Sequence, residues 1–172
     1  RRLETAQVNG YELEFTYNDE GIRTSKDVNG VTHYYHLAGS QILSEEWTEN
    51  GVTHLLVYNY DADGTIMGMS YRNSTYDVQR FDNYLFIKNI QGDVLHIYDE
   101  NGTKVVSYLY DAWGNITSTT GSLASTIGKM NPFRYRGYYY DEELGFYYLN
   151  SRYYDPKIGR FINADGFVST GQ

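Results

Sequence analysis

The sequence contains no cysteine and only 2 prolines, whereas it contains 17 glycines in 172 residues. Without cysteine there is no disulfide framework and no thiolate chemistry, which suits the cytosol and equally a secreted protein that avoids oxidation. No apolar run approaches the roughly 20 residues of a membrane-spanning helix, and the N-terminus has no signal-peptide pattern. Because the chain does not begin with methionine, we expect it to be a piece of a longer protein.

Positive charge is also scarce, since 14 Lys and Arg face 22 Asp and Glu and give a net charge of −8. Phosphate binding needs clustered basic side chains, so we do not expect nucleic acid to be a partner. Residues 131–161, called the cassette below, differ from the rest because they carry 5 basic and 4 acidic side chains and eleven of the 29 aromatic residues. Such a nearly neutral, aromatic segment in an acidic chain indicates that the rest of the chain encloses the cassette or provides a surface on which it docks.

Glycines recur at short intervals from Gly10 to Gly121, and most of them are the last residue of a polar turn motif. Asn-Gly pairs at positions 9, 29, 50 and 101 are strong signals for β-hairpins. Between the turns, apolar and polar residues alternate, as in Tyr11–Tyr17 and Val52–Tyr60, and this period of two is typical of strands. The sequence therefore predicts an all-β fold of about ten strands, arranged as an antiparallel meander of short hairpins, with at most a short helical turn near residues 122–129.

One unit recurs along the chain: an aromatic residue, an acidic residue or its amide, two or three variable residues, and glycine. Copies begin at Tyr17, Tyr60, Tyr98 and Tyr110. Self-similarity of this kind marks a repeat architecture, in which each unit buries its apolar face only against its neighbours. Terminal repeats then need a cap, and the cassette is placed to provide it.

The repeats resemble the YD repeats of the RHS family, which includes teneurin and WapA-like proteins, and the cassette resembles the RHS-associated core signature. The matching runs are Asn131-Pro132-Phe133-Arg134-Tyr135, Gly137-Tyr138-Tyr139-Tyr140-Asp141, Gly145-Phe146-Tyr147-Tyr148, Arg152-Tyr153-Tyr154-Asp155-Pro156, Gly159-Arg160-Phe161-Ile162 and Asp165. The resemblance covers nearly the whole chain and is most specific in the cassette. It implies a β-sheet strip that forms part of a spiralling hollow shell and ends in an irregular aromatic plug.

Several expectations follow from this resemblance. It implies YD repeats over 1–121, a linker over 122–130, the core signature over 131–165, and the start of a junction to a C-terminal toxin domain over 166–172. The function implied is structural: the shell of a bacterial polymorphic toxin, secreted or on the cell surface, encloses and presents that toxin domain. The expected partners are the remainder of the shell and the toxin, with self-association through open sheet edges, and no cofactor is expected.

The plug implied by the core signature consists of aromatic, basic and turn-forming residues. Its members are Pro132, Phe133, Arg134, Tyr135, Arg136, Gly137, Tyr139, Tyr140, Asp141, Gly145, Tyr147, Tyr148, Arg152, Tyr153, Tyr154, Pro156, Gly159, Arg160 and Phe161. Arginine among aromatic rings suits cation–π contacts and guanidinium stacking. We therefore expect the cassette to be largely buried, with its arginines holding it in an otherwise acidic shell.

Two carboxylates are candidates for chemistry. In several family members an aspartyl autoprotease follows the signature, and such a site needs two carboxylates that share one proton. Asp155 and Asp165 lie ten residues apart and could meet across a turn; the alternative is that Asp155-Pro156 and Asp165-Gly166 only form turns. The sequence departs from the family pattern because it reads Asp165-Gly166-Phe167 and lacks the second Asp-Pro motif expected downstream.

Other kinds of site are less well supported. The histidines His33, His36, His54 and His96 lie on strand patterns without a third ligand at metal spacing, so no metal site is expected. The turn motif at Asp61 has arginine where a calcium loop needs its bidentate glutamate. The many tyrosines could stack on sugars in an adhesin, although cross-strand packing is the favoured interpretation.

Overall fold

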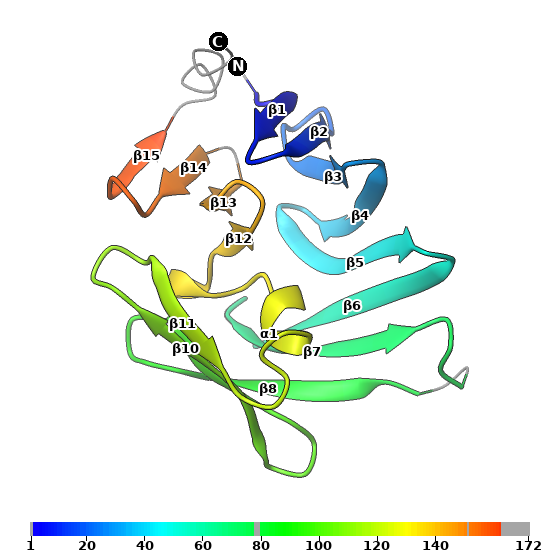
Figure 1. The fold of residues 1–172 in the computed structure, drawn as a ribbon, viewed down its shortest axis with the longest axis vertical. Coiled ribbons are helices and arrows are strands. Elements are labelled where there is room, and N and C mark those ends of the chain that lie inside the picture. The colour runs from blue at the N-terminus through cyan, green and yellow to red at the C-terminus, as the bar shows by residue number, and fades with distance from the viewer. Residues whose placement is uncertain (1, 78–79, 151, 163–172) are drawn as a thin grey trace.

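A computed structural model describes residues 2–77, 80–150 and 152–162 of the chain as two antiparallel sheets. Figure 1 shows a long sheet, called the strip here, that bends around a smaller one. The strip has eleven strands in sequence order. They are β1 (Thr5–Val8), β2 (Tyr11–Tyr17), β3 (Arg23–Val28), β4 (Val31–Ala38), β5 (Gln41–Glu49), β6 (Val52–Tyr60), β7 (Ile66–Asn73), β8 (Asp82–Lys88), β9 (Val94–Tyr98), β10 (Lys104–Tyr110) and β11 (Ile116–Thr120). The predicted antiparallel meander is therefore confirmed.

Tight Asn-Gly turns join the strands at one end of the strip. Asn9, Asn29 and Asn50 each have φ of 50° and each precedes a glycine with positive φ, which is the backbone of a two-residue hairpin turn. The pair at Asn101 differs from this prediction, because only Gly102 adopts positive φ. Asn101 instead lies inside a longer turn that begins at Asp99.

The longer turns share one hydrogen-bond pattern. At Asp61, the side-chain Oδ1 accepts from the backbone N–H groups of Asp63 and Thr65, both at 2.9 Å, and the N–H of Gly64 donates to the Asp61 carbonyl. Turns that begin at Asn18, Asn89, Asp99 and Asp111 repeat this pattern. The pairing register shifts beside each of these turns. Such bulges increase local twist and contribute to the curvature of the strip.

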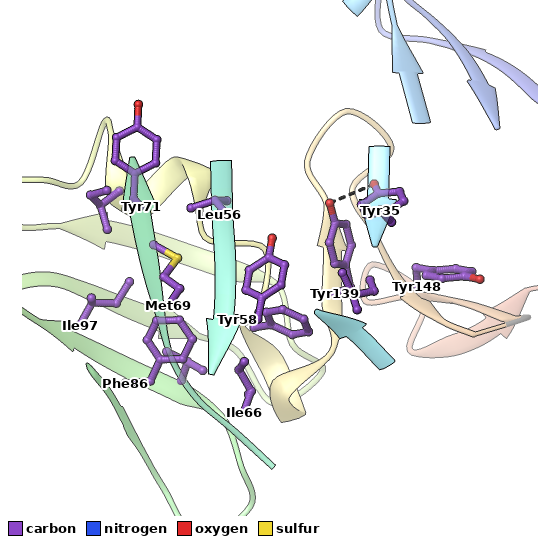
Figure 2. Packing of buried hydrophobic residues seen from close by; sticks show 14 of the residues in the cluster. Tyr35, Leu56, Tyr58, Ile66, Met69, Tyr71, Phe86, Ile97, Tyr139 and Tyr148 are labelled. Carbon is purple, nitrogen blue, oxygen red and sulfur yellow. Dashed lines mark hydrogen bonds between the residues drawn. The ribbon is translucent and has the colours of Figure 1, made fainter. Parts of the chain in front are cut away.

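Alternation along each strand gives the strip an apolar inner face. Leu13, Phe15, Leu56, Met69 and Ile97 are among the buried residues, and Figure 2 shows Leu56, Met69 and Ile97 in this core. The same cluster continues into the cassette. The core of the chain therefore lies between the strip and the cassette.

Gly68 in β7 allows an unusually close approach of the neighbouring strand. A Cβ atom built there would lie 2.2 Å from the backbone carbonyl oxygen of Tyr84 in β8, and a backbone atom has little freedom to move away. We expect Gly68→Ala to lower the free energy of unfolding by about 1–3 kcal/mol. Urea unfolding would test this, and Gly30→Ala, which meets nothing within 4 Å but lies at φ of +88°, would show for comparison what backbone strain costs without a clash.

A short packed segment connects the strip to the smaller sheet. It includes the helical turn α1 (Ile127–Met130) and the 3₁₀ turn η1 (Tyr135–Gly137). Ile127 is buried, and the Tyr108 hydroxyl donates to the Gly128 carbonyl at 2.6 Å. Residues 122–130, expected to be a linker, therefore pack against the inner face of β10.

The cassette contains a regular sheet where the sequence predicts an irregular segment. The small sheet consists of β12 (Tyr139–Asp141), β13 (Phe146–Leu149), β14 (Arg152–Asp155) and β15 (Arg160–Ile162), in that order. Each strand has only three or four residues, which is too short for a convincing alternation in the sequence. Pairing between strands places Tyr139, Tyr148 and Tyr153 on one face and Tyr140, Tyr147 and Tyr154 on the other.

Candidate functional site: the docked cassette

The small sheet lies between the two ends of the strip (Figure 1). The face that carries Tyr139, Tyr148 and Tyr153 contacts β2 to β5, in the first half of the strip. The opposite face, with Tyr147 and Tyr154, contacts the turn between β10 and β11. One small sheet therefore connects strands that are far apart in the strip.

A buried group of charged side chains docks the first face. The Arg23 guanidinium on β3 forms two bonds to the Asp141 carboxylate on β12, Nη1 to Oδ2 at 2.8 Å and Nη2 to Oδ1 at 2.9 Å. Lys26 Nζ lies 3.2 Å from Asp141 Oδ1 and 3.1 Å from Glu143 Oε2. The side chains of Arg23 and Asp141 are 1% and 0% exposed. Each buried charge therefore depends on its partner across the interface.

Aromatic rings surround the Arg23 guanidinium. Its Cζ lies 4.3 Å from the ring centroid of Tyr148 and 5.3 Å from those of Tyr35 and Tyr139. The Phe15 ring is 5.1 Å away. Cation–π attraction is strongest where water is excluded, so these rings compensate part of the desolvation of the guanidinium.

A chain of hydrogen bonds extends from this group to a second buried carboxylate. The Tyr35 and Tyr139 hydroxyls lie 3.1 Å apart (Figure 2). The Tyr139 hydroxyl donates to Glu45 on β5, 2.8 Å from Oε2. Glu45 Oε2 also accepts from the Tyr58 hydroxyl at 2.7 Å, and its Oε1 lies 2.9 Å from His33 Nδ1. The buried polar side-chain atoms of the interface are thus paired with one another, as buried polar groups generally are, except Arg23 Nε, which has no hydrogen-bond partner among the described residues.

The two buried carboxylates have pKa values below their ordinary range. Burial alone would raise the pKa of Asp141, but the adjacent Arg23 and Lys26 cations outweigh it. Burial would likewise raise the pKa of Glu45, whereas its hydrogen bond and charge interaction with His33 lower it. Both groups therefore favour the charged form in the folded state.

These shifts predict how stability depends on pH. A carboxyl whose folded pKa is lowered contributes stability that is fully present above its unfolded pKa, near 4, and is lost as the pH falls through the lowered value. We expect the part of the unfolding free energy that is due to Asp141 and Glu45 to be constant from pH 7 to 5 and to fall below about pH 4. Denaturant unfolding at a series of pH values would measure it, and Asp141→Asn should flatten the acid decline.

Consecutive carbonyls of the β10–β11 turn hold the second face. The carbonyls of Ala112, Trp113 and Gly114 accept from the hydroxyls of Tyr135, Tyr154 and Tyr147 at 3.4, 2.6 and 2.8 Å, respectively. In addition, Asn115 Nδ2 donates to the Pro156 carbonyl at 2.8 Å. The last repeat turn of the strip is thereby fastened to the cassette along its whole length.

Phe133 and Arg134 anchor the entry into the cassette. The Phe133 ring meets the rings of Tyr58 and Tyr139 edge to face, with centroids 4.8 and 5.8 Å apart. The Arg134 guanidinium lies over the rings of Tyr108 and Tyr140 at 5.2 and 5.0 Å and donates to backbone carbonyls of residues 128, 129 and 131. Both residues are buried and connect β6 and β10 to the cassette.

The structure divides the predicted plug residues by burial. Nine are buried: Pro132, Phe133, Arg134, Tyr139, Asp141, Tyr147, Tyr148, Tyr153 and Pro156. Six are half-buried: Tyr135, Gly137, Tyr140, Gly145, Tyr154 and Gly159. Four are exposed: Arg136, Arg152, Arg160 and Phe161. Arg136 and Arg152 still lie over the rings of Tyr135 and Phe161, at 5.2 and 4.5 Å.

The structure places Asp155 in a turn. Its Oδ1 accepts from the backbone N–H of Lys157 at 2.8 Å, at the end of β14. Asp165 lies outside the described residues, so the distance between these two carboxylates remains untested. Within the described ranges, no group of three His, Asp or Glu residues could hold a metal ion, and none of their helices is long and apolar enough to cross a membrane.

The partners of the cassette on the strip are residues that sequence reasoning did not single out. Arg23, Lys26 and Glu45 lie on ordinary strand patterns, and nothing near them in sequence reports that Asp141 is their neighbour. One signal was present, because Lys26 and Glu45 alternate in step with inward-facing residues. A charged residue at an inward strand position is unusual and indicates a buried partner.

Comparisons with known proteins agree with this fold. The profile described as Teneurin YD-shell matches residues 78–170, more than half of the chain. The tRNA nuclease WapA of Bacillus subtilis (strain 168) is 40% identical over 153 residues, which are 88% of this chain and 6% of WapA. Double-stranded DNA deaminase toxin A of Burkholderia cenocepacia is 28% identical over 183 residues, which cover 95% of this chain and 13% of that protein.

A solved structure has the same arrangement of strands. The crystal structure of TcdB2-TccC3-TEV aligns with 90% of this chain and 8% of that chain, with a TM-score of 0.58 and 17% sequence identity. This likeness concerns the fold, and the chain spans only a small part of each of these proteins. Together with the profile match, it confirms the resemblance that the repeats and the cassette indicated: the chain belongs to the Teneurin YD-shell family.

Proposed function

We propose that this chain is a structural encapsulation module, the part of an RHS-repeat toxin shell that encloses and presents a C-terminal effector. The observation that supports this most directly is the small sheet, which the two ends of the strip cover on both faces. A strip fastened in this way forms a curved wall that ends in a docked cassette. The chain would contribute containment, and the effector would contribute the toxic activity.

The relatives support the same proposal. WapA is named as a tRNA nuclease and the Burkholderia protein as a DNA deaminase toxin, yet this chain matches only 6% and 13% of them. A part that two proteins with different activities share is suited to a common carrier role. Secretion or exposure on the cell surface would follow from that role.

The proposal includes a division of the chain. Residues 1–121 would be repeats of the wall, 122–130 the connection, 131–165 the cassette, and 166–172 the start of the junction to the effector. The order matters because an effector that follows the cassette in sequence would begin close to the small sheet. No effector is specified by these residues.

Limited proteolysis of a parent protein that carries shell and effector would test the proposal. We expect the effector to resist protease while the shell is folded and to be digested at the rate of the free effector once the shell is unfolded. A matched parent protein with Asp141→Asn should expose the effector at lower denaturant concentration. Digestion of the effector at its free rate inside a folded shell would contradict encapsulation.

The edges of the strip predict self-association of the isolated chain. Among the described strands, β1 and β11 each have a partner on one side only, and the sequence of β11 (Ile116–Thr120) contains no charged residue and no proline. Such edges pair readily with other strands. We expect concentration-dependent dimers or larger species in size-exclusion chromatography, and Thr120→Lys, at an exposed position of β11, should reduce them. A stable monomer at all concentrations would contradict this prediction.

A further inference from the structure

A cavity of about 700 Å³ lies between the inner face of β3 to β6 and the segment from α1 to β12. This volume is within the range of ligand-binding pockets. Carboxylates outnumber ammonium groups in its lining, since Glu45, Glu49, Glu142 and Glu143 face Lys26 and Lys129. Glu142 and Glu143 are paired with Arg134 and Lys26, so Glu49 is the exposed carboxylate that forms no ion pair in the described structure. We call this cavity the inner groove.

A stack of three rings forms one wall of the inner groove. Trp47 lies between His33 and His54, with centroids 4.8 and 5.0 Å apart and planes tilted by 16° and 11°. The faces of the indole are therefore occupied by imidazoles, and its edge is the part that can meet a ligand. This arrangement provides no open ring face on Trp47 for a sugar to stack on.

The hydrogen bonds of the two histidines determine what the ring edges offer. Glu45 accepts from His33 Nδ1, so His33 Nε2 is an acceptor when the ring is neutral and a donor when the ring is protonated. Asn73 donates to the Tyr71 hydroxyl, which lies 2.8 Å from His54 Nδ1; when that hydroxyl donates to Nδ1, His54 Nε2 carries the proton of the neutral ring. Trp47 Nε1 is a donor. In the described part of the chain these three ring nitrogens have no protein partner.

Ring nitrogens that donate, with His33 Nε2 able to accept, suit the carbonyl and N–H groups of an extended backbone, and nearby carboxylates suit cationic side chains. Glu49 is exposed, and its charge acts on the neighbouring His54. Glu143 is one-fifth exposed beside Lys26. The groove therefore combines backbone recognition with a preference for positive charge.

We infer that the inner groove binds an extended, cationic segment of the polypeptide that the shell encloses. This inference rests on the proposed function and specifies the chemistry of the enclosed partner. Effectors that act on RNA or DNA, as the names of the relatives describe, need Lys and Arg to contact phosphate. An acidic, hydrogen-bonding groove on the inner wall is complementary to such a chain.

Fluorescence of Trp47 in the isolated chain would test this inference. The chain has two tryptophans, so Trp113→Phe leaves Trp47 as the single reporter in the groove. An unstructured Lys/Ser peptide should change the Trp47 emission saturably, and the effect should weaken as salt increases. A Glu/Ser peptide of equal length should produce no saturable change.

A matched pair of variants on β5 locates the binding site. Glu49 shares the inner face with Trp47, whereas Glu46 lies on the opposite face of the same strand and is exposed. Glu49→Gln should weaken binding of the Lys/Ser peptide about two- to fivefold, and Glu46→Gln should leave it unchanged.

Three results would overturn the inference: no saturable change in emission, equal binding of the acidic peptide, or equal effects of the two variants. Binding of a single-stranded oligonucleotide in preference to the Lys/Ser peptide would also overturn it. These outcomes are independent of the proteolysis experiment, because encapsulation can hold without any specific contact in this groove.

Discussion

Replacing Asp141 by asparagine is expected to lower the free energy of unfolding by about 3–5 kcal/mol. The substitution keeps the size of the side chain and removes its charge. Arg23, whose side chain is 1% exposed, would then lack the carboxylate that compensates its burial, and Lys26, which is 5% exposed, would keep only the partly exposed Glu143. Because an unpaired buried cation is costly, the cassette should loosen from the strip before the strip itself unfolds.

Urea unfolding would measure this effect, with Asp155→Asn as the control. Asp155 also contributes a hydrogen bond, to the N–H of Lys157, but it forms no ion pair in the described structure. Its substitution should cost about 1 kcal/mol. If the two variants had equal midpoints, the buried ion pairs would not be what docks the cassette.

A double-mutant cycle separates the pairing from the loss of either side chain. Arg23→Met removes the guanidinium and keeps an apolar side chain of similar length. If the two side chains stabilise the chain through their pairing, the double variant Arg23→Met/Asp141→Asn should lose less free energy of unfolding than the sum of the two single variants. The difference, the coupling energy, should be about 1–3 kcal/mol. Additive losses would mean that each residue stabilises the chain by separate contacts.

Replacing Phe133 by alanine is expected to lower the free energy of unfolding by about 3–5 kcal/mol. The ring is 7% exposed and packs edge to face against Tyr58 and Tyr139. Both neighbours donate to Glu45, so their hydrogen bonds limit how far they can move to fill the space. A site that cannot collapse is one where the cavity cost is highest.

The control for this prediction is Phe161→Ala in the same cassette. Phe161 is 49% exposed and contacts Tyr154 and Arg152, so its loss should cost about 1 kcal/mol or less. Thermal unfolding of both variants would compare them. A Phe133→Ala loss as small as that of Phe161→Ala would show that the cassette is not packed on β6 as described.

Local features of the fold could be predicted because their causes are local in sequence. Asn29-Gly30 needs only its own backbone preferences to form a tight turn, and the Asp61 turn needs only bonds within five residues. Alternation in Val52–Tyr60 likewise specifies which residues face inward. The repeats and the strip therefore follow from the sequence with little information from elsewhere.

The docking of the cassette could not be predicted in the same way. Asp141 and its partner Arg23 are 118 residues apart, and no local signal joins them. The expectation that buried arginines of the cassette hold it in place applies to Arg134, whereas Arg136 and Arg152 are exposed. At the interface with β3 the charges are arranged in the opposite way to this expectation: the cations belong to the strip, and the buried anion belongs to the cassette.

Native-state hydrogen exchange tests most directly whether strip and cassette form one cooperative unit. The amides of Tyr147 and Tyr148 in β13 report the cassette, and those of Leu56 and Tyr58 in β6 report the strip. Our account predicts free energies of exchange for the β13 amides that approach those of the β6 amides. The account would be contradicted if the β13 amides exchanged through a local opening while β6 stayed protected, with a free energy of exchange several kcal/mol below that of the β6 amides.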